Sequence, residues 1–366
     1  MTQPVTVNRF TAFDRLRGLI MVVMAIDHAS YFIARVHASE IWSEVPQPST
    51  ITRWITHLCA PGFFMLMGAG MVWLGKARQQ AGWSHAQIRK FFITRGLALL
   101  VVQQLIENPA WALGDLSINP ALANLHPSPG GGSDFFLHFA VISALAVAMI
   151  FWAFLIELPS IVVLAVSGAA LAASVWMTPS PSEAATLFSP WLRLLFIPGH
   201  TNVINVLYPW VPWLAPAGLG ILIGRIVARD PSRTARLAFG LAPLLLFPGL
   251  AYFVWSAAPG VFLKYPPSPA FLALTLAADL WLLGVFTVSS GLKLFAPLEV
   301  FGRAPLFFYL LHLWVFSLLG FAFPNGTSMP VMYGVWAVAV VAMYPACVWY
   351  AQFKNAKPTT SMWRLF

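Results

Sequence analysis

Ten long apolar runs dominate this chain and limit what it can fold into. A helix that crosses the hydrocarbon core of a bilayer needs about 20 mostly apolar residues. Strands of a membrane barrel are about ten residues long and alternate in polarity, so continuous runs predict helices. The runs lie at 16–35, 57–74, 92–108, 135–154, 160–177, 208–227, 237–255, 269–287, 304–323 and 330–350.

The shortage of charge supports a membrane fold. Charged residues make up 9% of the chain and hydrophobic residues 59%, whereas a soluble domain carries about a quarter charged residues. The run at 92–108 is the weakest because Arg95, Gln103 and Gln104 interrupt it. We therefore predict an all-α, polytopic membrane bundle of about ten transmembrane helices, forming a single domain over residues 1–366.

The basic residues predict the orientation of this bundle. With the N-terminus in the cytoplasm, 17 of the 21 Lys and Arg residues fall on the inner side, as the positive-inside rule requires. The outer side then holds four, namely Arg35, Arg53, Arg193 and Lys264. We expect a multi-pass protein of the inner (cytoplasmic) membrane with both termini inside, and its net charge of +9 indicates topology rather than nucleic-acid binding.

Ionisable residues inside the first run are the leading candidates for a site, because such groups are costly in a membrane. Arg17 and His28 are eleven residues apart, so they share a helix face and lie roughly 16 Å apart along its axis. One elongated ligand could touch both, with phosphate at Arg17 and proton transfer at His28. Asp27 is the second buried candidate. The alternative is structural: Arg17 anchors the helix at the lipid headgroups, and His28 forms a hydrogen bond with a neighbouring helix.

Other histidines extend this candidate site. Arg53 and His57 are four residues apart at the outer end of the second run and share a face, so His57 could converge with His28. His138 begins the fourth run at its outer end, and His200 lies in an outer loop. Both could rim the same cavity, or simply be solvated.

Asp279 and His312 lie near the middle of two consecutive runs. Their position makes a mutual structural pair the expected arrangement.

Several kinds of chemistry find no support in the sequence. The two cysteines, Cys59 and Cys347, have no metal-ligand spacing, and no metal is expected. Walker and dinucleotide-binding loops are absent, as are zinc-hydrolase and serine-hydrolase motifs. Chemistry in this chain would depend on a histidine general base and a bound activated donor.

Five separate pieces of the sequence, spread from the first apolar run to the ninth, carry a resemblance to a known family. The pieces are Arg15–His28, Arg53–Gly68, Tyr208–Arg225, Lys264–Ser268 and Phe301–His312. Together they resemble the bacterial membrane proteins grouped with heparan-alpha-glucosaminide N-acetyltransferase, and the resemblance covers nearly the whole chain.

The resemblance implies transfer of an acyl group, expected to be acetyl, from cytoplasmic acetyl-CoA to an acceptor on the other side of the membrane. The spacing of Arg17 and His28 is also similar to an Arg/His motif of the acyltransferase-3 family, which makes His28 the leading base and Arg17 a donor-site residue. The heparan enzyme has Asn where this chain has Asp27. The catalytic histidine of that enzyme lies on the outer side in a His-x-x-Trp-x-Gly sequence, which is not found in this chain. Whether His28 or His57 is the base stays open.

We therefore expect an acyl-CoA-dependent acyltransferase that acts on a sugar or another amine or hydroxyl acceptor. Its surroundings are the lipid bilayer, and a homodimer is one possible assembly. The rival is a proton-coupled transporter or flippase, with a relay through Asp27, His28, Asp279 and His312. A scaffold subunit is disfavoured by the buried Asp27–His28 pair. The expected catalytic residues are His28, Asp27 and His57, the donor-binding residues Arg17 and Arg303, and the acceptor-binding residues Arg53, His138 and His200.

Overall fold

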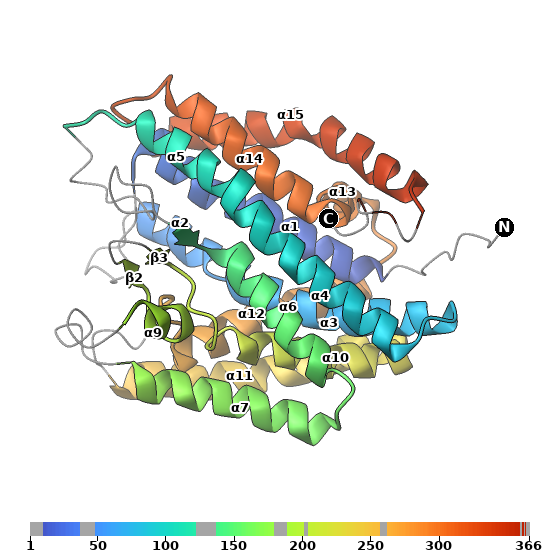
Figure 1. Cartoon of the computed structure of the whole chain (residues 1–366). Coiled ribbons are helices and arrows are strands. Elements are labelled where there is room, and N and C mark those ends of the chain that lie inside the picture. Colours follow the sequence, from blue (N-terminus) through green and yellow to red (C-terminus); the bar gives the residue numbers. More distant parts are fainter. Residues whose placement is uncertain are drawn as a thin grey trace.

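A bundle of long helices running side by side makes up most of the structure, a computed structural model (Figure 1). The structure describes residues 10–36, 48–121, 137–178, 189–200, 204–256 and 262–358, together with Ser361 and Trp363.

The first half of the bundle has two features that interrupt ordinary α-helix. The first helix ends in a π-helical turn, and a second π-helical turn joins α4 to α5 into one continuous helical run. The elements are α1 (Thr11–Ala29), η1 (Ser30–Ala34), α2 (Pro48–Thr56), α3 (Cys59–Gln80), α4 (His85–Val102), η2 (Gln103–Glu107), α5 (Asn108–Leu116), α6 (Val141–Leu155) and α7 (Ser160–Met177).

The second half contains the remaining helices and two of the three short strands. Its helices are α9 (Pro190–Leu195), α10 (Leu214–Arg229), η3 (Pro231–Arg233), α11 (Thr234–Ser256), α12 (Pro269–Val288), η4 (Lys293–Phe295), α13 (Ala296–Arg303), α14 (Pro305–Gly320) and α15 (Met329–Ala356). The strands are β1 (Leu137–Phe139), β2 (Gly199–His200) and β3 (Ile204–Val206).

All ten predicted apolar runs contain a helix, but the number of membrane spans is smaller by length and hydropathy. Six helical segments are long and apolar enough to cross a bilayer, or seven if α13 and α14, which meet at an angle of 82°, form one span. The 15 residues of α6 reach about 22 Å at 1.5 Å per residue, which is short of a hydrocarbon core of about 30 Å. The chain is a multi-pass helical membrane protein; ten spans and cytoplasmic termini remain predictions.

The structure corrects the predicted start of the fourth run. Residues 137–139 form strand β1, and helix α6 begins only at Val141. Gln103 and Gln104 explain the change: Gln104 Nε2 donates to the carbonyl of His138 at 2.9 Å, and Gln103 Oε1 accepts from the Ser143 amide at 2.9 Å. These glutamines, which weakened the prediction of a third span, satisfy backbone groups at the start of α6.

Two helices lie almost entirely outside the ten predicted apolar runs. Residues 108–116 form α5, and residues 48–56 form α2. Pro109 lies in the first turn of α5, where proline is tolerated because the amide there has no intrahelical acceptor.

The three strands form a small sheet in the order β1-β3-β2. Strand β1 is parallel to β3, with His138 opposite Asn205, and β2 is antiparallel to β3. The sheet therefore fixes the backbone of His138 at the entrance to α6.

Helix α1 lies at the centre of the bundle, in contact with α3, α12, α13, α14 and α15. Its approach to α13 is close because each helix presents a glycine. A Cβ atom on Gly18 would lie 1.8 Å from the Leu298 carbonyl oxygen, and one on Gly302 would lie 1.8 Å from the Asp14 carbonyl oxygen. Small residues permit such close helix contacts in membranes.

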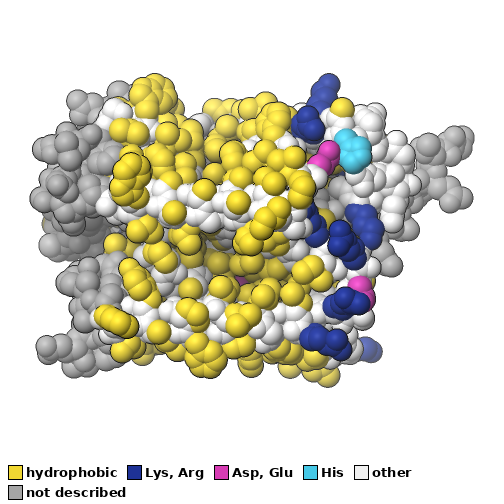
Figure 2. All heavy atoms as spheres, turned by 90° about the horizontal axis from the view of Figure 1, so that it is seen from below, with side chains coloured by type: hydrophobic (Ala, Val, Ile, Leu, Met, Phe, Trp, Pro, Cys, Tyr) yellow, Lys and Arg dark blue, Asp and Glu magenta, His cyan; other side chains and the backbone are white. Residues whose placement is uncertain are grey.

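One face of the molecule agrees with a membrane setting. Apolar side chains cover its middle, while the charged side chains on this face gather at one end (Figure 2). Exposed apolar residues of α7 and α11 include Ile161, Leu164, Leu244, Phe247 and Trp255. In water such a surface would be an unusually large apolar patch, whereas in a bilayer it is the expected lipid contact.

We predict that Gly18→Ala lowers the stability of the protein by about 1–3 kcal/mol, the usual cost of overpacking. Gly334→Ala on α15 is the matched control, because a Cβ atom there meets nothing within 4 Å. Thermal unfolding in detergent measures both. A Gly18→Ala protein as stable as the Gly334→Ala control would contradict the close packing of α1 on α13.

Candidate active site

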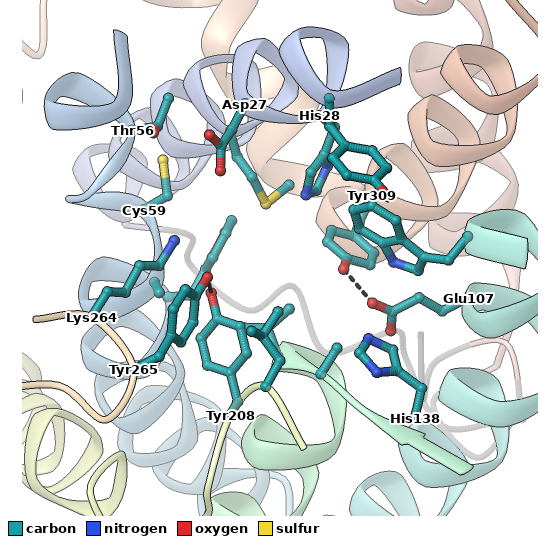
Figure 3. A pocket seen from close by; sticks show the side chains of 18 of the residues that line it. Asp27, His28, Thr56, Cys59, Glu107, His138, Tyr208, Lys264, Tyr265 and Tyr309 are labelled. Atoms are coloured by element: carbon teal, nitrogen blue, oxygen red, sulfur yellow. Dashed lines mark hydrogen bonds between the residues drawn. The ribbon is translucent and has the colours of Figure 1, made fainter. Parts of the chain in front are cut away.

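A pocket of about 190 Å³ lies where α1, α2, α3, α5, α14 and the strand β1 meet (Figure 3). We call it the histidine pocket. Its polar lining comes from elements far apart in the sequence. These residues are Asp27, His28, Tyr31, Arg53, Thr56, Cys59, Glu107, Trp111, His138, Tyr208, Lys264, Tyr265 and Tyr309.

His28 is held in this pocket by a second histidine. Its Nδ1 lies 2.7 Å from Nε2 of His312, and Nδ1 of His312 lies 2.8 Å from the carbonyl oxygen of Phe308. A carbonyl oxygen only accepts, so Nδ1 of His312 carries the proton and the Nε2 of a neutral His312 accepts from His28. The neutral His28 ring is therefore protonated at Nδ1 and has its lone pair on Nε2, where a general base needs it.

This contact replaces the predicted pairing of His312 with Asp279. Asp279 is fully buried near Gly62, and neither of its carboxylate oxygens has a hydrogen-bond partner among the described residues. The prediction was wrong because adjacent helices in the sequence need not present their polar residues to each other. His312 faces α1 instead.

Asp27 forms a salt bridge with Arg53, which joins α1 to α2 on the wall of the pocket. Neighbours on a helix point about 100° apart, so Asp27 contacts α2 while His28 contacts α14. Arg53 is only 3% exposed. A buried arginine with a carboxylate partner holds its charge beside the cavity at a much lower cost than an unpaired one.

Lys264 and two tyrosines form another part of the lining. The hydroxyl of Tyr265 donates to that of Tyr208 at 3.3 Å, and Lys264 Nζ lies 5.1 Å from the centre of the Tyr265 ring. Burial, with the Tyr265 phenol beside it, raises the pKa of Tyr208 well above its usual range. Lys264 was placed in an outer loop as a topological charge, and the structure shows it 4% exposed in the pocket.

Glu107 and Tyr309 form a buried pair on the remaining wall. The Tyr309 hydroxyl and Glu107 Oε1 lie 2.6 Å apart, and Glu107 Oε2 has no hydrogen-bond partner within the described residues. His138 lies beside Glu107 in Figure 3, and the backbone of Asn205 lies near its ring. Burial lowers the pKa of His138 to about 4, so this ring is neutral at ordinary pH.

A second, larger cavity of about 1040 Å³ lies between α1, α3, α4, α6, α14 and the end of α15. We call it the arginine cavity, because six basic residues line it: Arg17, Arg78, Arg95, Arg303, Lys354 and Lys357. The rest of its lining is mostly apolar, with Met, Leu and Phe side chains such as Met21, Leu66 and Met149.

The arginines of this cavity are held in defined positions. Arg17 Nη1 donates to Asp14 at 3.0 Å and to the Gly302 carbonyl at 3.1 Å, and Arg303 Nη2 donates to Glu299 at 2.6 Å. Arg78 stacks on the rings of Trp83 and Phe91, with its guanidinium carbon 4.0 Å and 3.7 Å from their centres. Such planar cations suit phosphate groups.

The two cavities share three lining residues: Phe63, Val141 and Tyr309. Arg17 and His28 were predicted to contact one elongated ligand, and the structure places them in different cavities that meet at this partition. Tyr309 is the polar member of the partition and has its hydroxyl on Glu107.

The remaining expected site residues lie elsewhere. His57 is 2% exposed and hydrogen-bonds through Nδ1 to the Arg53 carbonyl, and its ring packs against those of Phe262 and Phe271. It does not line the histidine pocket, so it does not converge with His28. His200 lies on β2, and its side chain is outside the described part of the structure.

Sequence reasoning missed Glu107 and Tyr309. Glu107 lies within the apolar run at 92–108, and the same rule that singled out Asp27 could have found it. Tyr309 has no comparable signal, because an aromatic residue in an apolar helix is most often part of the core.

Comparison with known proteins agrees with a membrane enzyme. Residues 9–253, more than half of the chain, match the family described as heparan-alpha-glucosaminide N-acetyltransferase, catalytic. The chain belongs to this family and is a transmembrane acyltransferase of the acetyltransferase type. A search of curated proteins finds no match. No group of three or more His, Cys, Asp or Glu residues that could hold a metal is found within the described ranges.

We predict that ¹⁵N spectra of histidine-labelled protein contain neutral His28 and His312 rings protonated at Nδ1. His312→Phe removes the acceptor for His28, so the His28 signal moves toward the Nε2-protonated form. His85→Phe on the exposed surface is the control, since it removes one signal without changing the others. A His28 ring protonated at Nε2 in the unaltered protein would contradict the assigned tautomer.

Proposed function

We propose that this protein transfers an acetyl group from acetyl-CoA, bound in the arginine cavity, to an amine or hydroxyl group of an acceptor in the histidine pocket. The observation that carries this proposal is the shared partition of the two cavities. A donor and an acceptor that enter from different sides can react only where their cavities meet.

The arginine cavity fits the donor by size and chemistry. Its volume of about 1040 Å³ is at the upper end of the usual range for small-molecule sites, about 300–1,000 Å³. Acetyl-CoA has a phosphate-rich nucleotide end and a thin, less polar arm. Arg17, Arg95 and Arg303 are suited to the phosphates, and the apolar wall is suited to the arm.

The histidine pocket supplies the base for the acceptor. His28 Nε2 is the unprotonated nitrogen of the His28–His312 pair, and it can take the proton of the attacking amine or hydroxyl group. His312 acts through His28 as a positioning residue. Asp27 and Arg53, joined by their salt bridge, and His138 are placed to orient the acceptor.

The reaction follows from these positions. The acceptor nitrogen or oxygen forms a bond to the acetyl carbon, the carbon–sulfur bond breaks, and His28 holds the acceptor proton. The acceptor class in the family name is a glucosaminide, so a glycan amine is one candidate and a hydroxyl group the other. The transporter alternative is not favoured, because family membership indicates an acetyltransferase-type enzyme.

Charge distribution supports an orientation for the transfer. With the 17 basic residues at the cytoplasmic side of an inner membrane, the arginine cavity opens toward cytoplasmic acetyl-CoA. The histidine pocket then serves an extracytoplasmic acceptor.

The direct test uses acetyl-CoA labelled in the acetyl group, with membranes that contain the protein and with glucosamine and glucose as test acceptors. We expect label to leave CoA and appear on an acceptor. We expect His28→Asn to lower this rate by about 10²–10⁴-fold, the usual contribution of a general base. His57→Asn is the matched comparison, with a much smaller loss. Label that stays entirely on CoA, or full activity of His28→Asn, would overturn the proposal.

We predict a different kinetic effect for the arginine cavity. Arg17→Gln and Arg95→Gln should each raise the KM for acetyl-CoA by about tenfold or more, since a hydrogen bond to a charged group contributes about 1.5–3 kcal/mol. The kcat should change little, because phosphate binding is the same in the ground state and the transition state. Arg233→Gln, an exposed residue paired with Asp230, is the control. An unchanged KM in both cavity variants would place the donor elsewhere.

A further inference from the structure

We propose that Tyr309 and Glu107 form a proton relay to the leaving thiolate, with Tyr309 as a catalytic residue and Glu107 as the group that supplies its proton. This inference rests on the proposed acetyl transfer. It concerns the half of the reaction that His28 does not serve, namely protonation of the sulfur.

The position of Tyr309 is the first support. It lines both cavities, so its hydroxyl lies at the partition where the thioester of a bound donor would meet the acceptor. The ring of Tyr309 also lies 6.1 Å, centre to centre, from that of His28. His28 and Tyr309 are therefore close enough to face the same reacting atoms.

The surroundings of Glu107 are the second support. It is 0% exposed, its Oε1 is 2.6 Å from the Tyr309 hydroxyl, and its Oε2 has no partner among the residues described. A structural carboxylate in an apolar setting normally has its oxygens satisfied by cations or several donors. Glu107 instead has Tyr309 at Oε1 and the Trp111 indole near its carboxyl group, and no cation among the described residues balances its charge.

The relay balances the protons of the reaction. The carbon–sulfur bond breaks and the electron pair goes to sulfur. The Tyr309 hydroxyl, which donates to Glu107 Oε1 in the resting protein, turns to give its proton to sulfur. A Glu107 carboxyl group that holds a proton then gives it to the Tyr309 oxygen. The acceptor proton held by His28 returns to Glu107 through the histidine pocket, which both residues line. No oxidant or further reactant is required.

The arrangement also gives Glu107 a route for regeneration. Trp111 lies near both groups: its ring is 5.3 Å from that of His28, and its indole lies near the Glu107 carboxyl group. His28 and Glu107 both line the histidine pocket, so water or an acceptor hydroxyl group in the pocket can carry the proton back to Glu107.

The test compares two acetyl donors with different leaving groups. Acetyl-CoA leaves as an alkyl thiolate that needs a proton, whereas S-acetyl-4-nitrothiophenol leaves as a stable aryl thiolate that does not. Glucosamine or glucose, whichever accepts label in the wild-type protein, is the acceptor. We expect Tyr309→Phe and Glu107→Gln to lower kcat with acetyl-CoA by about 100-fold or more, with little change in KM. With the aryl thioester the loss should fall below about fivefold, whereas His28→Asn should lose activity with both donors.

Ser317→Ala is the matched control. The Ser317 hydroxyl donates to the Ala110 carbonyl at 2.6 Å, so this variant removes a buried hydrogen bond between α14 and α5 without touching either cavity. It should keep its activity with both donors. Glu107→Gln keeps the shape of the side chain and serves if Tyr309→Phe does not fold.

The outcomes separate the relay from the proposed function. Equal losses with both donors, or no loss with acetyl-CoA, would overturn the relay while leaving acetyl transfer intact. A wild-type protein that transfers acetyl from neither donor would overturn the proposed function and the relay with it.

Discussion

The hydrocarbon core of a bilayer offers no hydrogen bonds to polar side chains, and this constraint determines where polar groups lie in the bundle. His28 bonds to His312, Asp27 to Arg53, and Glu107 to Tyr309. Each pair joins two different helices, so the same contacts that satisfy polar groups also fix the helices around the histidine pocket. The close approach of α1 to α13 then places the arginine cavity at the other end of the same central helix.

The partition between the two cavities favours group transfer over transport of a whole substrate. A protein that moved a whole substrate would need a continuous path, whereas an acetyl group needs only a junction at which two bound molecules meet. Phe63, Val141 and Tyr309 form such a junction. His28 lies on one side of the junction, and Arg17, Arg95 and Arg303 lie on the other. This division matches the separate needs of acceptor activation and donor binding in the proposed transfer.

The positions of the ten longer helices and the candidate residues Asp27 and His28 could be predicted from the sequence, whereas α2, α5 and the contacts between helices could not. Hydropathy located all ten helical runs, and the cost of buried charge singled out Asp27 and His28. The pairing of His312 with His28 rather than Asp279 depends on how helices rotate against each other. Strand β1 was missed because its backbone hydrogen bonds go to β3 and to Gln104, which lie far from it in the sequence. Residues 137–139 themselves carry no local strand signal.

The most direct measurement is a structure of the protein with a thioether analogue of acetyl-CoA, in which the carbon–sulfur bond cannot break. The account predicts phosphates among Arg17, Arg95 and Arg303, and the sulfur beside the Tyr309 hydroxyl with its acetyl end toward His28. A nucleotide in the histidine pocket, or a sulfur far from Tyr309, would contradict the division of the site into donor and acceptor cavities.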